Sequence, residues 1–251
     1  MNDRGSRDAI DLVSAPTQKH LDDLKAWLRR EEEETGQGFF CNWRAIQSCF
    51  DDGALHCAVR SGEAVALSVW ERWRGRAVML IDNVRPDLRR AGIGRQLAEY
   101  TMAELQRDGV LVIEGECKPT SSEPFWRKLG FEDPPRYQRS RGGIRLFRRL
   151  VDHHVATDDA ACACTLTLWS SPDYGIDAGT ESWTWDLGTL TGDGWRLGKP
   201  IIHPCPDPDW CVEVRASGNV LFRGKLKYLP EDHWRTCSGF LYVDRLSAAL
   251  D

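Results

Sequence analysis

The stretch VRPDLRRAGIGRQL at residues 84–97 carries three local signals in a fixed order. It closes an apolar segment, Ala77–Val84, that is typical of a strand, then places glycines at 92 and 94, and leads into a segment expected to be helical to about Arg107. Glycine lacks the Cβ atom that would keep a ligand away from the backbone. The first N–H groups of a helix attract anions, so the stretch predicts a strand, an anion-binding loop and a helix.

Three arginines in this loop narrow the kind of anion. The long cationic side chains of Arg89, Arg90 and Arg95 can bind an anion without a metal ion, and this part of the sequence lacks the lysine-serine pair of a nucleotide P-loop. We therefore expect a pyrophosphate carried by something other than Mg-ATP. A structural turn before a helix is the alternative interpretation. The loop residues assigned to the cofactor are Arg89, Arg90, Ala91, Gly92, Ile93, Gly94 and Arg95.

The segments around the loop predict alternating strands and helices. Ile10–Val13 is expected to be a strand, and Pro16-Thr17 to open a helix in which Leu21, Leu24, Trp27 and Leu28 recur at helical spacing. The acidic run Glu31–Glu34 is interpreted as the solvated end of that helix. Further elements are expected at Trp43–Phe50 (helix), Leu55–Arg60, Ala64–Trp70 and Val110–Glu116 (strands), and from Ser121-Ser122 to Gly130 (helix).

The last hundred residues have a different texture. Short alternating segments separated by Gly, Pro and Asp predict an all-β region, with a polar linker at about residues 151–161. Residues 1–150 hold 25 Lys and Arg against 23 Asp and Glu, whereas residues 151–251 hold 8 against 15. We expect two domains, 1–150 and 162–251. Of Trp183 and Trp185 in the second, only one is expected to face the core.

Residues 8–150 resemble the GNAT superfamily of N-acetyltransferases. Arg89, Gly92 and Gly94 match the signature Arg/Gln-x-x-Gly-x-Gly/Ala, and Phe125–Phe131 resembles the helix and Gly-Phe pair that these enzymes place beside the pantetheine arm. The resemblance implies an α/β (α+β) fold: a mixed seven-stranded sheet flanked by helices, with the fourth and fifth strands splayed apart around a thioester. Here a smaller β-rich domain follows it.

The resemblance also implies an activity and further site residues. It implies an N-acetyltransferase that moves an acetyl group from acetyl-CoA, by direct attack, to an amine-bearing acceptor, small or macromolecular, without a metal. Asn83 and Val84 would contribute backbone contacts to the acyl donor, and Phe125 and Trp126 would lie beside it.

Two departures from the family pattern leave the proton chemistry open. Trp126 stands where many members have a tyrosine that protonates the thiolate, and Pro119 occupies the region of a common asparagine. Asp82, Glu114 and Glu116 are the candidate bases; we favour Glu114 or Glu116, which share one strand face. An ion pair with a neighbouring arginine is the alternative role of each. The departures also motivate a second hypothesis, an acyl-CoA-binding regulatory protein without turnover.

Two other clusters admit more than one interpretation. Trp70–Arg76 interleaves aromatic and basic residues, and the region from Arg136 to Arg149 contains six arginines, so nucleic-acid binding and a solvated hairpin are alternative interpretations. For Arg136, Arg139 and Arg141, an internal interface with the acidic second half is a further alternative. In the second half, His203, Cys205, Cys211, His233 and Cys237, with Cys162-x-Cys164, contain ligand types for zinc. They lack paired Cys-x-x-Cys knuckles, and buried thiols are preferred.

Cysteine content and hydropathy bear on location. Nine scattered cysteines, an odd number, suit reduced thiols, and we expect a cytoplasmic protein. No apolar run of signal-peptide or membrane-spanning length follows the charged residues 1–8, so we expect neither export nor membrane insertion. Exposed strand edges in the second domain would allow a homodimer.

Overall fold

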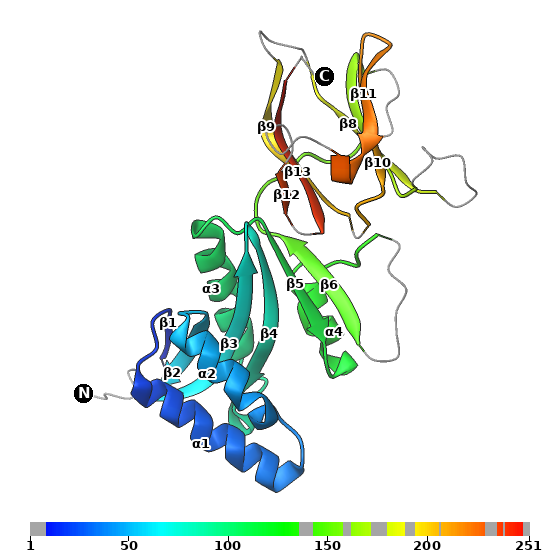
Figure 1. Ribbon diagram of the computed structural model, residues 1–251. Helices are drawn as coiled ribbons and strands as arrows, with labels where there is room; N and C mark the ends of the chain where they lie inside the picture. Colours follow the sequence, from blue (N-terminus) through cyan, green and yellow to red (C-terminus); the bar gives the residue numbers. More distant parts are fainter. Residues whose placement is uncertain are drawn as a thin grey trace. The chain divides into compact units, whose positions relative to one another are not determined.

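A computed structural model describes residues 9–135, 143–157, 162–171, 180–188, 194–205, 207–228, 235–237 and 239–247. For residues 235–237 it describes the backbone alone. The chain divides into two compact units, Met1–Leu150 and Val151–Asp251. Figure 1 labels the helices and strands of both units.

The first unit is built on a six-stranded mixed sheet in the order β1-β2-β3-β4-β5-β6. Its strands are β1 (Ile10–Val13), β2 (Leu55–Arg60), β3 (Glu63–Trp73), β4 (Arg76–Val84), β5 (Val112–Cys117) and β6 (Ile144–Arg149). All neighbours are antiparallel except β4 and β5, which run parallel. The mixed sheet agrees with the expected fold class. The expected count of seven strands is wrong for the described residues, where an isolated bridge between Glu132 and Phe147 flanks β6 instead.

Helices cover both faces of this sheet (Figure 1). On one face lie α1 (Gln18–Thr35), η1 (Phe40–Asn42) and α2 (Trp43–Asp51); on the other lies α3 (Ile93–Arg107). The remaining helices are η2 (Pro86–Leu88), η3 (Thr120–Ser122) and α4 (Glu123–Lys128). The apolar face predicted for α1 is confirmed, because all four expected residues are buried against strand residues such as Val69 and Ile81. Leu97 of α3 packs on Ala58 and Ala66 from the opposite face.

The second unit consists of two antiparallel sheets that share one core. One sheet has the order β11-β10-β7-β8 and the other β12-β13-β9. Their bounds are β7 (Cys164–Trp169), β8 (Ser182–Asp186), β9 (Gly194–Pro204), β10 (Cys211–Ala216), β11 (Asn219–Lys225), β12 (Arg235–Cys237) and β13 (Phe240–Ser247), with η4 at Leu226–Tyr228. The β-rich expectation is therefore confirmed.

Trp183 and Trp185 both pack on that shared core, which corrects the expectation that only one of them faces inward. Trp185 is 2% exposed and Trp183 is partly buried against the same cluster. Residues two positions apart on a strand lie on the same face of a sheet, so the expected alternation does not separate this pair.

Candidate functional site

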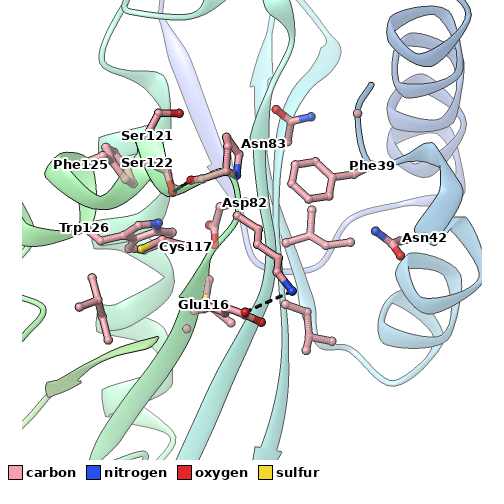
Figure 2. Close-up of a pocket in the computed structure, with 18 of the residues that line it drawn as sticks. Phe39, Asn42, Asp82, Asn83, Glu116, Cys117, Ser121, Ser122, Phe125 and Trp126 are labelled. Carbon is pink, nitrogen blue, oxygen red and sulfur yellow. Dashed lines mark hydrogen bonds and ion pairs between the residues drawn. The ribbon is translucent and has the colours of Figure 1, made fainter. Parts of the chain in front are cut away.

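The parallel pair β4 and β5 separates part of the way along its length. Strand pairing runs from Arg76↔Val112 to Met79↔Gly115 and ends there, although β4 continues to Val84 and β5 to Cys117. The expected splay of these two strands is thus present. A cavity of about 790 Å³ lies at the opening, lined by both strands, the α1–α2 connection and α4 (Figure 2).

The glycine loop lies between β4 and α3. Gly92 has φ = +83° and immediately precedes the first residue of α3, a backbone conformation that glycine adopts without a Cβ penalty. A Cβ added to Gly94 would lie 3.2 Å from Val84 Cγ2, so the helix start packs closely on the end of β4. The first N–H groups of an α-helix have no intrahelical acceptor, and an anion can accept from them.

The three loop arginines have different surroundings. Arg89 is directed back into the protein: its Nε donates to the Val84 carbonyl at 2.9 Å, and its guanidinium binds the carboxylate of Glu31. Arg95 is paired with Glu99 one helical turn away. Arg90 is exposed, has φ = +66°, and has no ion-pair partner within the described part of the chain. The assignment of these residues to a pyrophosphate stays a prediction.

Asn83 and Val84 are the last two residues of β4, beyond its pairing with β5. The Asn83 side chain accepts from the Val84 N–H at 2.9 Å and donates to Glu31 Oε2 at 3.1 Å. Both backbone polar groups of Val84 therefore have partners inside the unit, the N–H in Asn83 and the carbonyl in Arg89. An acyl donor that accepts from the Val84 N–H, as predicted, must displace the Asn83 side chain, whereas the Val84 carbonyl has a second lone pair for a donor group.

Glu31 is the site residue that sequence reasoning missed. The expectation of a solvated acidic run is wrong at this position, because Glu31 is 7% exposed, lines the cavity, and binds both Asn83 and Arg89. Its spacing carried the signal: Glu31 follows Leu24, Trp27 and Leu28 by seven, four and three residues, which places it on the apolar face of α1.

Asp82 is the candidate base with the most favourable environment. It lies on β4 beyond the point where pairing with β5 ends, and its side chain lines the cavity (Figure 2). Burial raises the pKa of Asp82 to about 7, and the hydroxyl of Ser68 acts in the opposite direction. A carboxyl group with a pKa near neutrality can accept a proton from an amine at physiological pH and release it again.

Glu114 and Glu116 are distinguished by their positions relative to the cavity. Glu114 is ion-paired with Arg76 and does not belong to the lining, which matches the alternative role weighed for it. Glu116 does line the cavity, and its carboxylate is 3.1 Å from Lys118 Nζ (Figure 2). A Cβ on Gly143 would overlap the Glu116 carboxylate, so the Glu116 side chain lies between Gly143 and Lys118.

Aromatic and hydroxyl side chains from the α4 region form the wall opposite Asp82. Phe125 and Trp126 line the cavity, and the Trp126 ring packs edge-on to Phe131 with the ring centroids 5.0 Å apart. Their position beside the acyl donor stays a prediction. Ser121 and Ser122 also line it, and Ser122 Oγ donates to the Pro119 carbonyl at 2.8 Å. These serines are the hydroxyl groups nearest in sequence to the position where the family pattern has tyrosine.

Other sequence hypotheses receive less support from the described residues. No cluster of three or more metal-ligating side chains is found among them, and His203 Nδ1 lies 2.8 Å from the Pro204 carbonyl. His233 and the side chain of Cys237 lie outside the described residues, as do Arg136, Arg139 and Arg141.

In the Trp70–Arg76 hairpin, Arg72 and Arg76 form ion pairs with Asp108 and Glu114. No described helix has the length and hydropathy of a membrane span.

Comparison with known proteins gives structural matches only. No protein-family model and no curated protein sequence matches the chain. Similar solved structures include a GNAT-family acetyltransferase from Staphylococcus aureus Mu50, with 14% identity over 57% of this chain and 100% of that one, TM-score 0.47. A second is the PaiA N-acetyltransferase of Thermoplasma acidophilum with coenzyme A, with 11% identity over 56% and 99% of the two chains, TM-score 0.48.

A third similar structure is the GNAT-family N-acetyltransferase YhbS from Escherichia coli in complex with CoA. It is 17% identical over 60% of this chain and 86% of that chain, with a TM-score of 0.47. At such identities the similarity concerns the fold alone. These three structures match between 56% and 60% of this chain.

Proposed function

We propose that the first unit is an acetyl-CoA-dependent N-acyltransferase that transfers an acetyl group to an amine acceptor. The observation that carries the proposal is the position of Asp82, whose carboxyl group has a pKa of about 7 and lines a cavity where two parallel strands separate. The glycine loop and the start of α3 follow β4 in the chain. Such an opening provides unpaired strand edges for a pantetheine amide and a nearby proton acceptor.

The donor would lie along β4 and reach the loop. The first N–H groups of α3, with Arg90 and Arg95, would hold the pyrophosphate by hydrogen bonds and charge. Arg89 is committed to Glu31 and the Val84 carbonyl, so we assign it the role of holding the end of β4 in shape. Phe125 and Trp126 would pack on the thioester arm from the other wall.

The reaction would follow a direct path. The neutral amine attacks the thioester carbonyl carbon, the C–N bond forms, and the C–S bond breaks as coenzyme A leaves as thiolate. Asp82 accepts the surplus amine proton, directly or through a water molecule, and Glu116 is the second candidate for that role. The thiolate takes up a proton from water, since the indole of Trp126 has no acidic hydroxyl to supply one, and the protonated Asp82 returns its proton to the hydroxide that is left.

The eight cysteines whose side chains are described are free thiols, which supports a reducing compartment such as the cytoplasm as the place of action. The acceptor would be an amine on a small molecule or on a macromolecule. A nucleic acid that contacts the Trp70–Arg76 hairpin is also proposed, either as the acceptor or as a binding partner.

A binding protein without turnover is the second candidate. It is favoured by the occupied backbone groups of Val84 and by Trp126 in place of a hydroxyl-bearing side chain. One experiment separates the two functions. Calorimetry measures acetyl-CoA binding, and mass spectrometry measures formation of coenzyme A with polyamines, aminoglycosides, amino acids and peptides as acceptors. Binding with product formation supports the enzyme, and binding without product from any acceptor supports the sensor.

A further inference from the structure

Three polar side chains form a row across neighbouring strands of the first sheet. His56 of β2 lies directly opposite Ser68 of β3, and Ser68 lies directly opposite Asp82 of β4. Directly opposed residues project from the same face of a sheet. The His56 end of the row meets α3, where His56 Nδ1 lies 3.0 Å from Thr101 Oγ1, and the Asp82 end reaches the cavity.

Ser68 is the unusual member of this row. Its side chain is fully buried, at 0% exposure, and its hydroxyl makes no hydrogen bond of ordinary length and angle within the described part of the chain, although it is close enough to Asp82 to lower the pKa of that carboxyl group. Burying a hydroxyl without a partner is unfavourable, and such groups are rare in folded proteins. On the far side, the His56 ring is enclosed by Thr101, Trp70 and Tyr100. The polar neighbour left to Ser68 within the row is therefore Asp82.

We propose that Ser68 is a positioning residue for Asp82: its hydroxyl donates to the Asp82 carboxylate and accepts from the protonated carboxyl group, which keeps the acid oriented toward the cavity in both states. The proposal rests on the proposed function of Asp82 as proton acceptor. A serine hydroxyl can serve both states because it is donor and acceptor. Since Ser68 is fully buried, it acts through Asp82 and does not itself meet a substrate.

The electrostatic surroundings are consistent with this role. Glu116 with Lys118 faces the cavity from the β5 side, Glu31 with Arg89 faces it from the α1 side, and the Cys117 thiol adds to the lining. His56 is kept neutral, because burial lowers its pKa to about 4. With the neighbouring charges paired, the Ser68 hydroxyl is the polar group that lowers the pKa of Asp82 against the effect of burial.

The test is the titration of Asp82 in Ser68→Ala and Ser68→Cys variants. Carboxyl-carbon NMR of protein labelled in aspartate follows the group, and Asp82→Asn identifies its signal. We expect Ser68→Ala to raise the pKa of Asp82 by about one unit, because the charged form loses a donor, and Ser68→Cys, a weak donor, to raise it by less. Below neutral pH, turnover of Ser68→Ala should be about tenfold lower than that of the wild type at the same pH. At high pH, where Asp82 is ionised in both proteins, the two rates should agree to within about twofold.

Control measurements separate positioning from folding. Thr101→Val removes a buried hydroxyl at the other end of the row and should leave the Asp82 titration unchanged. Ser68→Ala should keep a single cooperative thermal unfolding transition, which shows that the variant is folded when its titration is measured.

An Asp82 titration identical in wild type and both Ser68 variants would overturn the proposal, whatever the activity. Because the NMR titration needs no turnover, absence of acetyl transfer would reject the proposed function while the shift in Asp82 still supported the contact.

Discussion

The buried carboxylate of Glu31 accepts a hydrogen bond from Asn83 Nδ2 at 3.1 Å, which joins the middle of the sheet to α1 across 52 residues of sequence. The same carboxylate binds Arg89, which in turn donates to the Val84 carbonyl. One acidic side chain therefore holds the end of β4 and the start of the glycine loop in their relative positions.

Replacing Glu31 with Ala should destabilise the first unit and weaken acetyl-CoA binding. Removing the acceptor leaves Arg89 and Asn83 with unmatched donors, so we expect the free energy of unfolding to fall by about 1–3 kcal/mol and the Kd for acetyl-CoA to rise. Chemical denaturation and calorimetry measure the two effects. Glu34→Ala, an exposed substitution on the same helix, is the control, and an equal response of both variants would contradict the role given to Glu31.

Asp82→Asn should lower kcat by about 10²- to 10³-fold with little change in the affinity for acetyl-CoA. In the wild type the base must be ionised, so the rate should rise with pH through an apparent pKa near 7, the value to which burial raises Asp82. The variant should lose that limb. Steady-state rates of Asp82→Asn, Glu116→Gln and Glu114→Gln across pH identify the base.

Glu114→Gln should resemble the wild type, because Glu114 lies outside the cavity lining. If Glu116→Gln lowers turnover and Asp82→Asn does not, the base is Glu116.

Gly92→Ala should weaken acetyl-CoA binding beyond what backbone strain explains. Alanine at φ = +83° costs about 1 kcal/mol and brings a methyl group to the surface where the anion would sit. Gly53 provides a matched control, with φ = +69° and nothing within 4 Å of an added Cβ. Both variants should lose similar stability, but only Gly92→Ala should raise the Kd. Equal affinities in the two variants would argue against an anion at this loop.

His56 should make the first unit sensitive to acid. Burial lowers its pKa from 6.5 to about 4, so between these values the unfolded chain binds a proton that the folded chain does not. Stability is therefore greatest above pH 6.5 and falls, by up to about 3 kcal/mol, as the pH decreases toward 4. Denaturant unfolding of wild type and His56→Asn at several pH values checks this, since the difference between the two curves must change across that window.

Local sequence patterns predicted the elements whose cause is itself local. Leu21, Leu24, Trp27 and Leu28 recur at helical spacing, and they do form the buried face of α1. Gly92 likewise marks the position in the loop where a positive φ is needed, and α3 begins at Ile93 directly after it. Such features depend on residues a few positions apart, which a single sequence displays.

The roles of the charged side chains were decided by partners far away in the sequence. Glu114 became an ion-paired residue because parallel pairing of β4 with β5 brings Arg76 beside it. Asp82 faces the cavity because that pairing ends at Met79 and Gly115. The sequence by itself thus determined the helical face and the glycine loop, since backbone preference and periodicity are local. Only the tertiary structure decided which carboxylates are paired, buried or open to a ligand, because burial and electrostatic environment arise when distant strands and helices pack together.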